Sequence, residues 1–213
     1  MRLYDVIRKY LLPIVALAGA VMFVAACGEQ RVGLEEFSQK VYAPRYAVGF
    51  EIVGAEGHAS TILLSHNPWQ GAEDVQTALF IAREGEQPPA GFAGQVLRER
   101  AERIVCMSST HVALLDAVGA VQSVVGVSGI DFVTNEYVKA NRDKVRDVGY
   151  DNSVDYEMVV ALDPDVVLLY GVTGASSMES KLRELGIPSP TSASTSRRCR
   201  SARPSGWWPS ARL

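Results

Sequence analysis

The stretch that decides the fold runs from Leu162 to Tyr170 and reads Leu-Asp-Pro-Asp-Val-Val-Leu-Leu-Tyr. The Asp-Pro pair ends a preceding helix, because the residue before a proline is driven out of helical geometry. The apolar run that follows has no polar alternation, which is typical of a parallel strand covered on both faces. Two short apolar runs of the same kind lie earlier in the chain, at residues 104–107 (Ile-Val-Cys-Met) and 124–127 (Val-Val-Gly-Val).

Helical patterns alternate with these runs. In the first of them, Val112, Leu115 and Val118 fall on one face, residues 108–110 supply a cap and Gly119 ends the helix. Further helices are predicted near 135–141, from a cap at 152–153 through 162, and from 178 to 185. Strands separated by helices and short loops predict an α/β fold with a parallel sheet and right-handed crossovers.

In such a sheet, ligands gather beyond the carboxyl ends of the strands. Four segments are expected to share that edge: 108–111, 128–132, 149–152 and 170–174. The candidate ligand-binding residues on them are Ser108, Ser109, His111, Asp131, Tyr150, Asp151, Tyr170 and Gly171.

Each candidate has a structural alternative. The two serines suit a ligand carboxylate or phosphate, but they also suit helix capping. Neutral imidazole is a common metal ligand, but a histidine beside a cap also bonds locally, and the two aspartates suit turns. The tyrosines fit ligand contact or a half-buried strand end. No set of residues has the spacing of a metal site, so no metal ligands and no cofactor are predicted.

The amino terminus reads as an export signal over residues 1–26. Three basic residues precede an uncharged stretch from Leu11 to Ala26, which is short for a membrane span. It ends in Val-Ala-Ala-Cys27, which looks like a bacterial lipobox with Cys27 as the lipidated residue. The alternative is a marginal transmembrane anchor. A tether over 27–36 and a β-rich segment over 37–100 follow, with strands expected at 46–53, 60–65 and 77–82.

Composition excludes several classes of function. A net charge of −3 gives no electrostatic footprint for nucleic-acid binding. A content of 47% hydrophobic residues is typical of a globular protein and excludes a multi-spanning membrane protein. The segment 171–177 lacks the lysine and spacing of a phosphate-binding loop. Cys106 lies inside a predicted strand, where an inert buried thiol is the expected state.

The ordered set of motifs resembles a known family. The motifs are 103–111 (Arg-Ile-Val-Cys-Met-Ser-Ser-Thr-His), 124–129 (Val-Val-Gly-Val-Ser-Gly), 147–157, 162–170 and 185–188 (Leu-Gly-Ile-Pro). In this order they are similar to the amino-terminal lobe of class III periplasmic binding proteins, the substrate-binding components of iron-siderophore and cobalamin ABC importers. The predicted domain of this kind spans 101–188, as an incomplete amino-terminal lobe.

The resemblance implies two lobes joined by a long helix, with a ferric siderophore, haem or cobalamin held between them and delivered to an ABC permease. It implies binding without catalysis. The lipobox predicts attachment by lipid to a bacterial membrane, facing the periplasm or the cell exterior. The resemblance also implies that Glu179 pairs with permease arginines, with Glu157 and Glu184 as weaker candidates. Two alternatives stay open: a free zinc or manganese binder, and an α/β enzyme or sensor on a similar lobe.

The segment 189–213 does not fit this pattern. Residues 189–212 contain no Val, Ile, Leu, Met or Phe, but seven serines, five arginines and two tryptophans. No further strand is therefore expected, and the hypothesis is a shifted reading frame or other truncation near Pro188, with a natural basic disordered tail as the alternative. Residues 1–188 carry 16 basic and 24 acidic groups, so the lobe itself is acidic.

Overall fold

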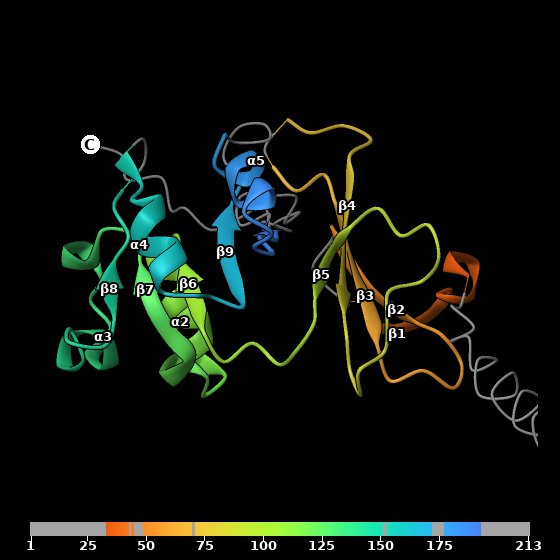
Figure 1. Cartoon of the computed structure of the whole chain (residues 1–213), viewed down its shortest axis with the longest axis horizontal. Coiled ribbons are helices and arrows are strands. Elements are labelled where there is room, and N and C mark those ends of the chain that lie inside the picture. The colour runs from red at the N-terminus through yellow and green to blue at the C-terminus, as the bar shows by residue number, and fades with distance from the viewer. Residues whose placement is uncertain are drawn as a thin grey trace, which may run out of the picture. The chain divides into compact units, whose positions relative to one another are not determined.

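The computed structural model describes residues 33–42, 44, 49–69, 71–150, 153–171 and 177–192. Within them, the strands form two five-stranded sheets (Figure 1). The predicted export signal, the predicted lipidation site Cys27, the candidate Asp151 and the tail from residue 193 lie outside the described residues.

The first sheet follows a short 3-10 turn, η1 (Leu34–Glu36), and its strands stand in chain order. They are β1 (Gln39–Tyr42), β2 (Phe50–Gly54), β3 (Thr61–His66), β4 (Gln76–Ile81) and β5 (Gln95–Leu97). Neighbours are antiparallel as far as β4, and β5 pairs with β4 in parallel. The three predicted strands are confirmed as β2, β3 and β4. β1 escaped prediction because its four residues are all exposed and carry no apolar alternation.

Aromatic packing gives this sheet its core. Ile62 of β3 stands opposite Phe80 of β4, and both are almost fully buried. Phe37 packs edge-on against Phe80 with ring centroids 5.9 Å apart, and Phe92 does so from 6.0 Å. Phe37 follows η1 and Phe92 precedes β5. Their contacts with Phe80 therefore fix the start and the end of the β-rich segment to the middle of the first sheet.

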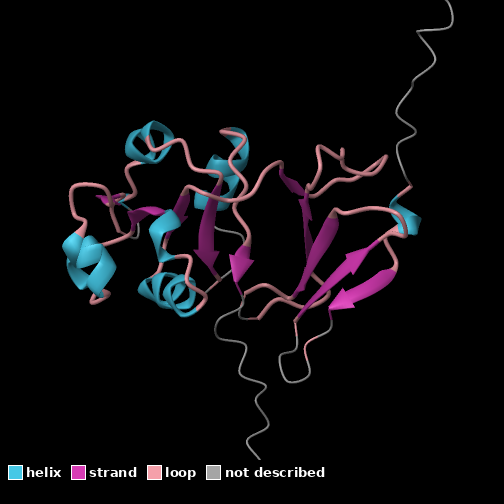
Figure 2. Ribbon diagram, turned by 90° about the horizontal axis from the view of Figure 1, so that it is seen from below, coloured by secondary structure: helices cyan, strands magenta, loops and turns pink. Residues whose placement is uncertain are grey.

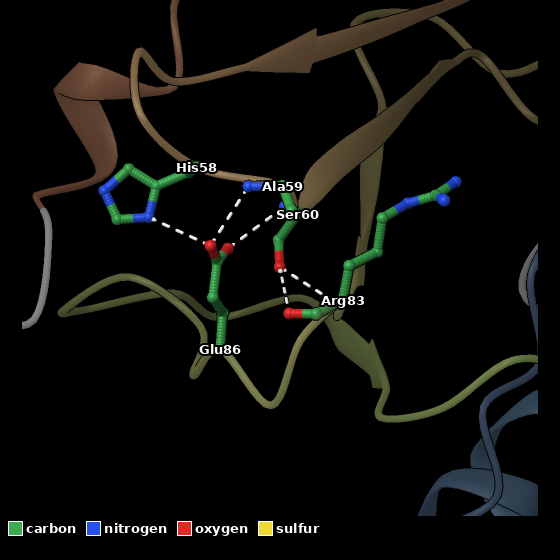
Figure 3. Close-up of polar contacts among 5 residues, drawn as sticks. All are labelled: His58, Ala59, Ser60, Arg83 and Glu86. Atoms are coloured by element: carbon green, nitrogen blue, oxygen red, sulfur yellow. Dashed lines mark hydrogen bonds and ion pairs between the residues drawn. The ribbon is translucent and has the colours of Figure 1, made fainter.

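A single carboxylate ties two loops of the first sheet together (Figure 3). Glu86, in the loop after β4, accepts backbone N–H bonds from Ala59 and Ser60, both at 3.0 Å. His58 Nδ1 lies 3.6 Å from the same carboxylate. The buried Ser60 hydroxyl accepts a bond from the Arg83 N–H at 2.9 Å. The loop before β3 is therefore fixed to the loop after β4.

The second sheet is parallel throughout, as the sequence predicted. Its strands are β6 (Ile104–Cys106), β7 (Val124–Val127), β8 (Arg146–Asp147), β9 (Val166–Tyr170) and β10 (Thr191–Ser192), in the order β10-β9-β6-β7-β8. The helices between them are α2 (Ser109–Ala117), α3 (Glu136–Ala140), α4 (Tyr156–Ala161) and α5 (Ser177–Glu184), with 3-10 turns η2 (Val121–Ser123) and η3 (Ile130–Phe132).

Alternation along β6 divides the core of this α/β lobe in two. Ile104 and Cys106 belong to one buried cluster, with Val112 of α2. Val105 belongs to the other, with Val159 of α4. Figure 2 shows helices on both sides of this sheet. The unalternated apolar runs therefore reflect strands that are buried on both faces.

Two local predictions were wrong. The cap of α4 is Asp155, whose carboxylate accepts the Met158 N–H at 2.9 Å, and not the pair at 152–153. A strand does follow Pro188, because Thr191 of β10 pairs in parallel with Leu169 of β9. A strand this short needs no apolar side chains, since backbone bonds such as Leu169 N–H to the Pro190 carbonyl at 3.1 Å hold it.

Among the described residues, the helices are too short and too polar to cross a membrane.

Replacing Glu86 with glutamine is expected to destabilise the fold by about 1 kcal/mol at pH 7, because the charged acceptor of two N–H groups is lost. Partial burial raises the pKa of Glu86, but hydrogen bonds from Ser60 and Ala59 and the nearby His58 outweigh it, so the pKa lies below its ordinary 4.5. The stability from the charged form is therefore present above pH 4.5 and is lost as the pH falls through the lower folded-state pKa.

Urea denaturation at pH 7 and at a series of acidic pH values measures the free energy of unfolding of wild type and Glu86→Gln. Glu99→Gln, at an exposed glutamate, is the matched control. A difference between wild type and Glu86→Gln that does not change with pH would contradict the assignment.

Candidate ligand-binding rim

The parallel sheet brings the predicted segments to one edge. Met107 N–H donates to the Leu168 carbonyl at 3.1 Å, Ser128 N–H to Cys106 at 3.0 Å, and the ends of β7 and β8 are joined in the same way. The carboxyl ends of β9, β6, β7 and β8 therefore lie side by side. We call residues 107–109, 128–132, 148–150 and 170–171 the rim.

Asp147, the last residue of β8, organises two segments of the rim. Its Oδ1 accepts the Gly129 N–H at 3.1 Å and the Gly149 N–H at 3.0 Å. Both glycines have positive φ, +61° and +81°, which side-chain-bearing residues rarely adopt. The turns after β7 and β8 are thus fixed to each other through one oxygen atom.

An exposed aromatic pair stands on these two turns. The rings of Phe132 and Tyr150 have centroids 6.0 Å apart and are tilted by 49°. Phe132 is 76% exposed and Tyr150 is 53% exposed. A Cβ on Gly129 would lie 3.0 Å from Phe132 and 3.4 Å from Tyr150, so the glycine leaves both rings their space. Large apolar rings left at a surface are typical of binding sites.

Ser108 and Ser109 stand where α2 begins. The Ser108 hydroxyl accepts the Thr110 N–H at 3.2 Å, which is the capping role weighed against ligand contact. Ser109 is exposed as the first residue of α2.

His111 lies inside the lobe rather than on the rim. It is only 4% exposed. Burial lowers the pKa of His111, and a hydrogen bond with the Leu168 backbone offsets this in part. The expectation of ligand contact does not fit this position, because the ring is enclosed between α2 and the sheet.

Asp131 and the residues at the end of β9 have distinct surroundings. Asp131 is exposed and forms a 2.7 Å ion pair with Arg142. Tyr170 is 38% exposed at the rim. Gly171 is buried, because Pro68 and Trp69 of the β3–β4 loop cover it. Asp131 and Tyr170 are therefore open to a ligand, whereas Gly171 is a packing position.

Glu179 is not the exposed charge that was expected. It is 7% exposed and accepts a 2.9 Å hydrogen bond from Arg183 one turn along α5. Both residues line an open pocket of about 610 Å³ together with Gln76 and Gln95 of the first sheet. The first sheet thus faces this side of α5, whereas Glu157 and Glu184 are exposed.

Cys106 has the environment predicted for it. It is fully buried, and burial raises the pKa of its thiol to about 12. Among the described residues, no three His, Cys, Asp or Glu side chains gather in a metal-binding arrangement.

Phe132 and Asp147 were not singled out from the sequence as site residues. Phe132 ends a predicted rim segment, so an aromatic residue in a loop after a buried strand was the available signal. The role of Asp147 depends on its bond to Gly129, 18 residues away, for which no local signal exists.

A sequence profile described as periplasmic binding protein matches residues 104–202. The match starts at β6 and includes the rim and β10. Residues 104–202 are therefore similar to the periplasmic binding protein family.

Individual relatives overlap with part of the chain. An uncharacterized lipoprotein of Methanocaldococcus jannaschii is 26% identical over 143 residues, which is 57% of this chain and 34% of that protein. The vitamin B12 binding protein BtuF of Vibrio cholerae is 21% identical, with 43% of this chain and 34% of that chain covered and a TM-score of 0.36.

An Fe3+-hydroxamate transport system protein from Saccharomonospora viridis is 26% identical, with 44% and 34% of the two chains covered and a TM-score of 0.31. The chain spans about a third of the length of each of these three relatives.

Removing the Asp147 carboxylate is expected to loosen the rim. Asp147→Ala leaves the Gly129 and Gly149 N–H groups without their acceptor and should destabilise the lobe by about 1–2 kcal/mol. Hydrogen exchange of those two amides should rise above wild type, and Asp143→Ala, at an exposed aspartate, should change neither measurement. Unchanged exchange at Gly129 would refute the bond.

Cys106 is expected to resist alkylation in the folded chain. Iodoacetamide reacts with the thiolate, and a pKa of about 12 leaves almost none at pH 8. Peptide mass spectrometry should find Cys106 modified only after denaturation, and the chain alkylated in denaturant is the reference. Rapid labelling of Cys106 under native conditions would contradict its burial.

Proposed function

We propose that this chain captures a ligand on its rim as part of the extracytoplasmic substrate-binding component of an ABC importer. The ligand class is iron-siderophore, haem or cobalamin. The chain binds and releases its ligand without chemical change and passes it to a membrane permease.

The observation that supports this most is the aromatic pair on the rim. Phe132 and Tyr150 leave much of their ring surface in water at the edge where α/β sheets bind ligands. Exposing such surface is unfavourable by about 25 cal/mol per Å² unless a ligand covers it. Tyr170 adds a third partly exposed ring at the end of β9.

The polar residues of the rim suit the polar periphery of such a ligand. Asp131 holds Arg142 at the surface, so a carboxylate and a guanidinium are both presented beside the rings. Ser109 and the backbone at the start of α2 provide donors for ligand carboxylates. Apolar rings with a few polar groups around them are the usual composition of a small-molecule site.

The proposed location is the outer face of a membrane, with Cys27 as the lipid-attachment residue. Support comes from the small residues before Cys27, from the preceding apolar stretch, and from the match to a protein described as a lipoprotein. Because Glu179 is buried, permease docking by α4 and α5 is proposed for the exposed Glu157 and Glu184.

In the experiment, the full chain is titrated with haemin, cyanocobalamin, ferrioxamine B, Zn²⁺ and Mn²⁺ in turn, and calorimetry measures the binding of each. At least one of the first three is expected to bind. Phe132→Ala should weaken that binding about three- to tenfold, the effect of one aromatic contact. Leu114→Ala, which removes an exposed apolar side chain of α2, is the matched control and should leave the affinity unchanged.

The outcomes separate the candidate functions. Binding of Zn²⁺ or Mn²⁺ alone would favour the free-metal alternative. Binding of none of the five would refute the proposal.

A further inference from the structure

One face of the first sheet is turned toward α5 and the segment before β10. Five side chains share this face, because the register of β3, β4 and β5 places their residues opposite one another or two apart along a strand. They are Leu63, Ser65, Thr77, Leu79 and Gln95. Gln95 Oε1 accepts the Ser189 N–H at 2.6 Å. The other four side chains therefore project to the same side of the sheet as the bond to Ser189.

An open pocket of about 610 Å³ lies against this face. All five of these residues line it, and Glu179 and Arg183 of α5 and the segment 186–191 line it from the other side. Pockets that hold small ligands commonly have volumes of about 300–1,000 Å³. The aromatic residues of the rim are not among the lining residues. The pocket therefore has the size of a ligand site and is separate from the rim.

The charged groups of the pocket differ in their access to solvent. Glu179 is 7% exposed, and its Oε1 accepts a 2.9 Å hydrogen bond from the Arg183 guanidinium. The Arg183 side chain is 67% exposed, and Arg98, which also lines the pocket, is exposed. The carboxylate thus lies inside, whereas the guanidinium groups lie toward the solvent.

Several polar groups of the pocket are open to a ligand. Within the part of the chain that the structure describes, the hydroxyls of Ser65 and Thr77 form no hydrogen bond with the protein. Ser189 also lines the pocket, and its buried hydroxyl has no partner among the same residues. A buried hydroxyl without a partner is unfavourable, so a group from outside the described chain is expected to satisfy it.

Apolar surface lies between these polar groups. Leu79 is buried, whereas Leu63 and Ile187, on opposite walls of the pocket, are half-buried. Hydroxyl and amide groups that alternate with apolar side chains suit a ligand that itself alternates backbone amides with apolar side chains. The buried carboxylate suits a positive group at one end of that ligand, since a charge-assisted bond is stronger away from water.

We propose that this pocket binds a short peptide with a free amino terminus and apolar side chains. The ammonium group of the peptide pairs with the Glu179 carboxylate, and the peptide carboxylate lies toward Arg183. The backbone of the peptide bonds to the open hydroxyl groups, and its side chains cover Leu63 and Leu79. This binding is independent of ligand capture on the rim.

The test titrates the full chain with trileucine and with N-acetyl-trileucine, and calorimetry measures both affinities. Trileucine is expected to bind, and acetylation should weaken binding about tenfold because the ammonium group is lost. Glu179→Gln should weaken trileucine binding by a similar factor and leave binding of the acetylated peptide within about twofold of wild type. Glu184→Gln, at an exposed glutamate of the same helix, is the matched control and should change neither affinity.

A second variant leaves the Glu179–Arg183 pair intact. Thr77→Val removes one hydroxyl at nearly constant volume and should weaken trileucine binding about three- to tenfold, the effect of one hydrogen bond. Thr110→Val, at an exposed threonine of α2, should have no effect. Unfolding midpoints of all variants establish that each is folded.

Three outcomes would overturn the proposal. They are failure of wild type to bind trileucine, equal affinities for the free and the acetylated peptide, and a loss of trileucine binding in Phe132→Ala, which would place the peptide on the rim. None of these results bears on whether the rim binds haemin, cyanocobalamin or ferrioxamine B.

Discussion

The burial of β6 on both of its faces is the constraint on which the lobe depends. Its residues alternate between two separate hydrophobic clusters, one shared with α2 and α3 and the other with α4 and α5. The neighbours of β6 are parallel, because the helices that cover the sheet also return the chain to the same end. All carboxyl ends therefore meet at one edge, and the rim is a consequence of how the core is covered.

In both sheets, a carboxylate that accepts two backbone N–H groups fixes the loops. In the first, the Glu86 carboxylate accepts two backbone N–H groups of a neighbouring loop. In the second, a single oxygen of Asp147 accepts the N–H groups of Gly129 and Gly149. An ionised acceptor strengthens such bonds, and each carboxylate satisfies donors that the strands leave unpaired. These loops are in this way held by charge-assisted hydrogen bonds to the backbone.

The α/β fold, the three central strands of the first sheet and the edge that carries the candidate residues could all be predicted from the sequence. Apolar runs and helical spacing are local signals, and Leu162 to Tyr170 contains both. The burial of Glu179 and His111 could not be predicted, because it depends on what packs against α5 and α2 from distant parts of the chain. The pairing of Phe132 with Tyr150 likewise requires that β7 and β8 be neighbours. β10 was missed because backbone hydrogen bonds, and not side-chain hydrophobicity, hold its two residues.

The backbone bonds that fix the position of the aromatic pair do not depend on the chemistry of its side chains. Phe132 and Tyr150 stand on turns that are fixed through the backbone of Gly129 and Gly149, so the support does not involve the rings themselves. Exchanging either ring for another side chain leaves the anchoring bonds in place. Point substitutions at these two exposed positions would therefore change the chemistry of the rim surface with little loss of stability and without redesign of the backbone.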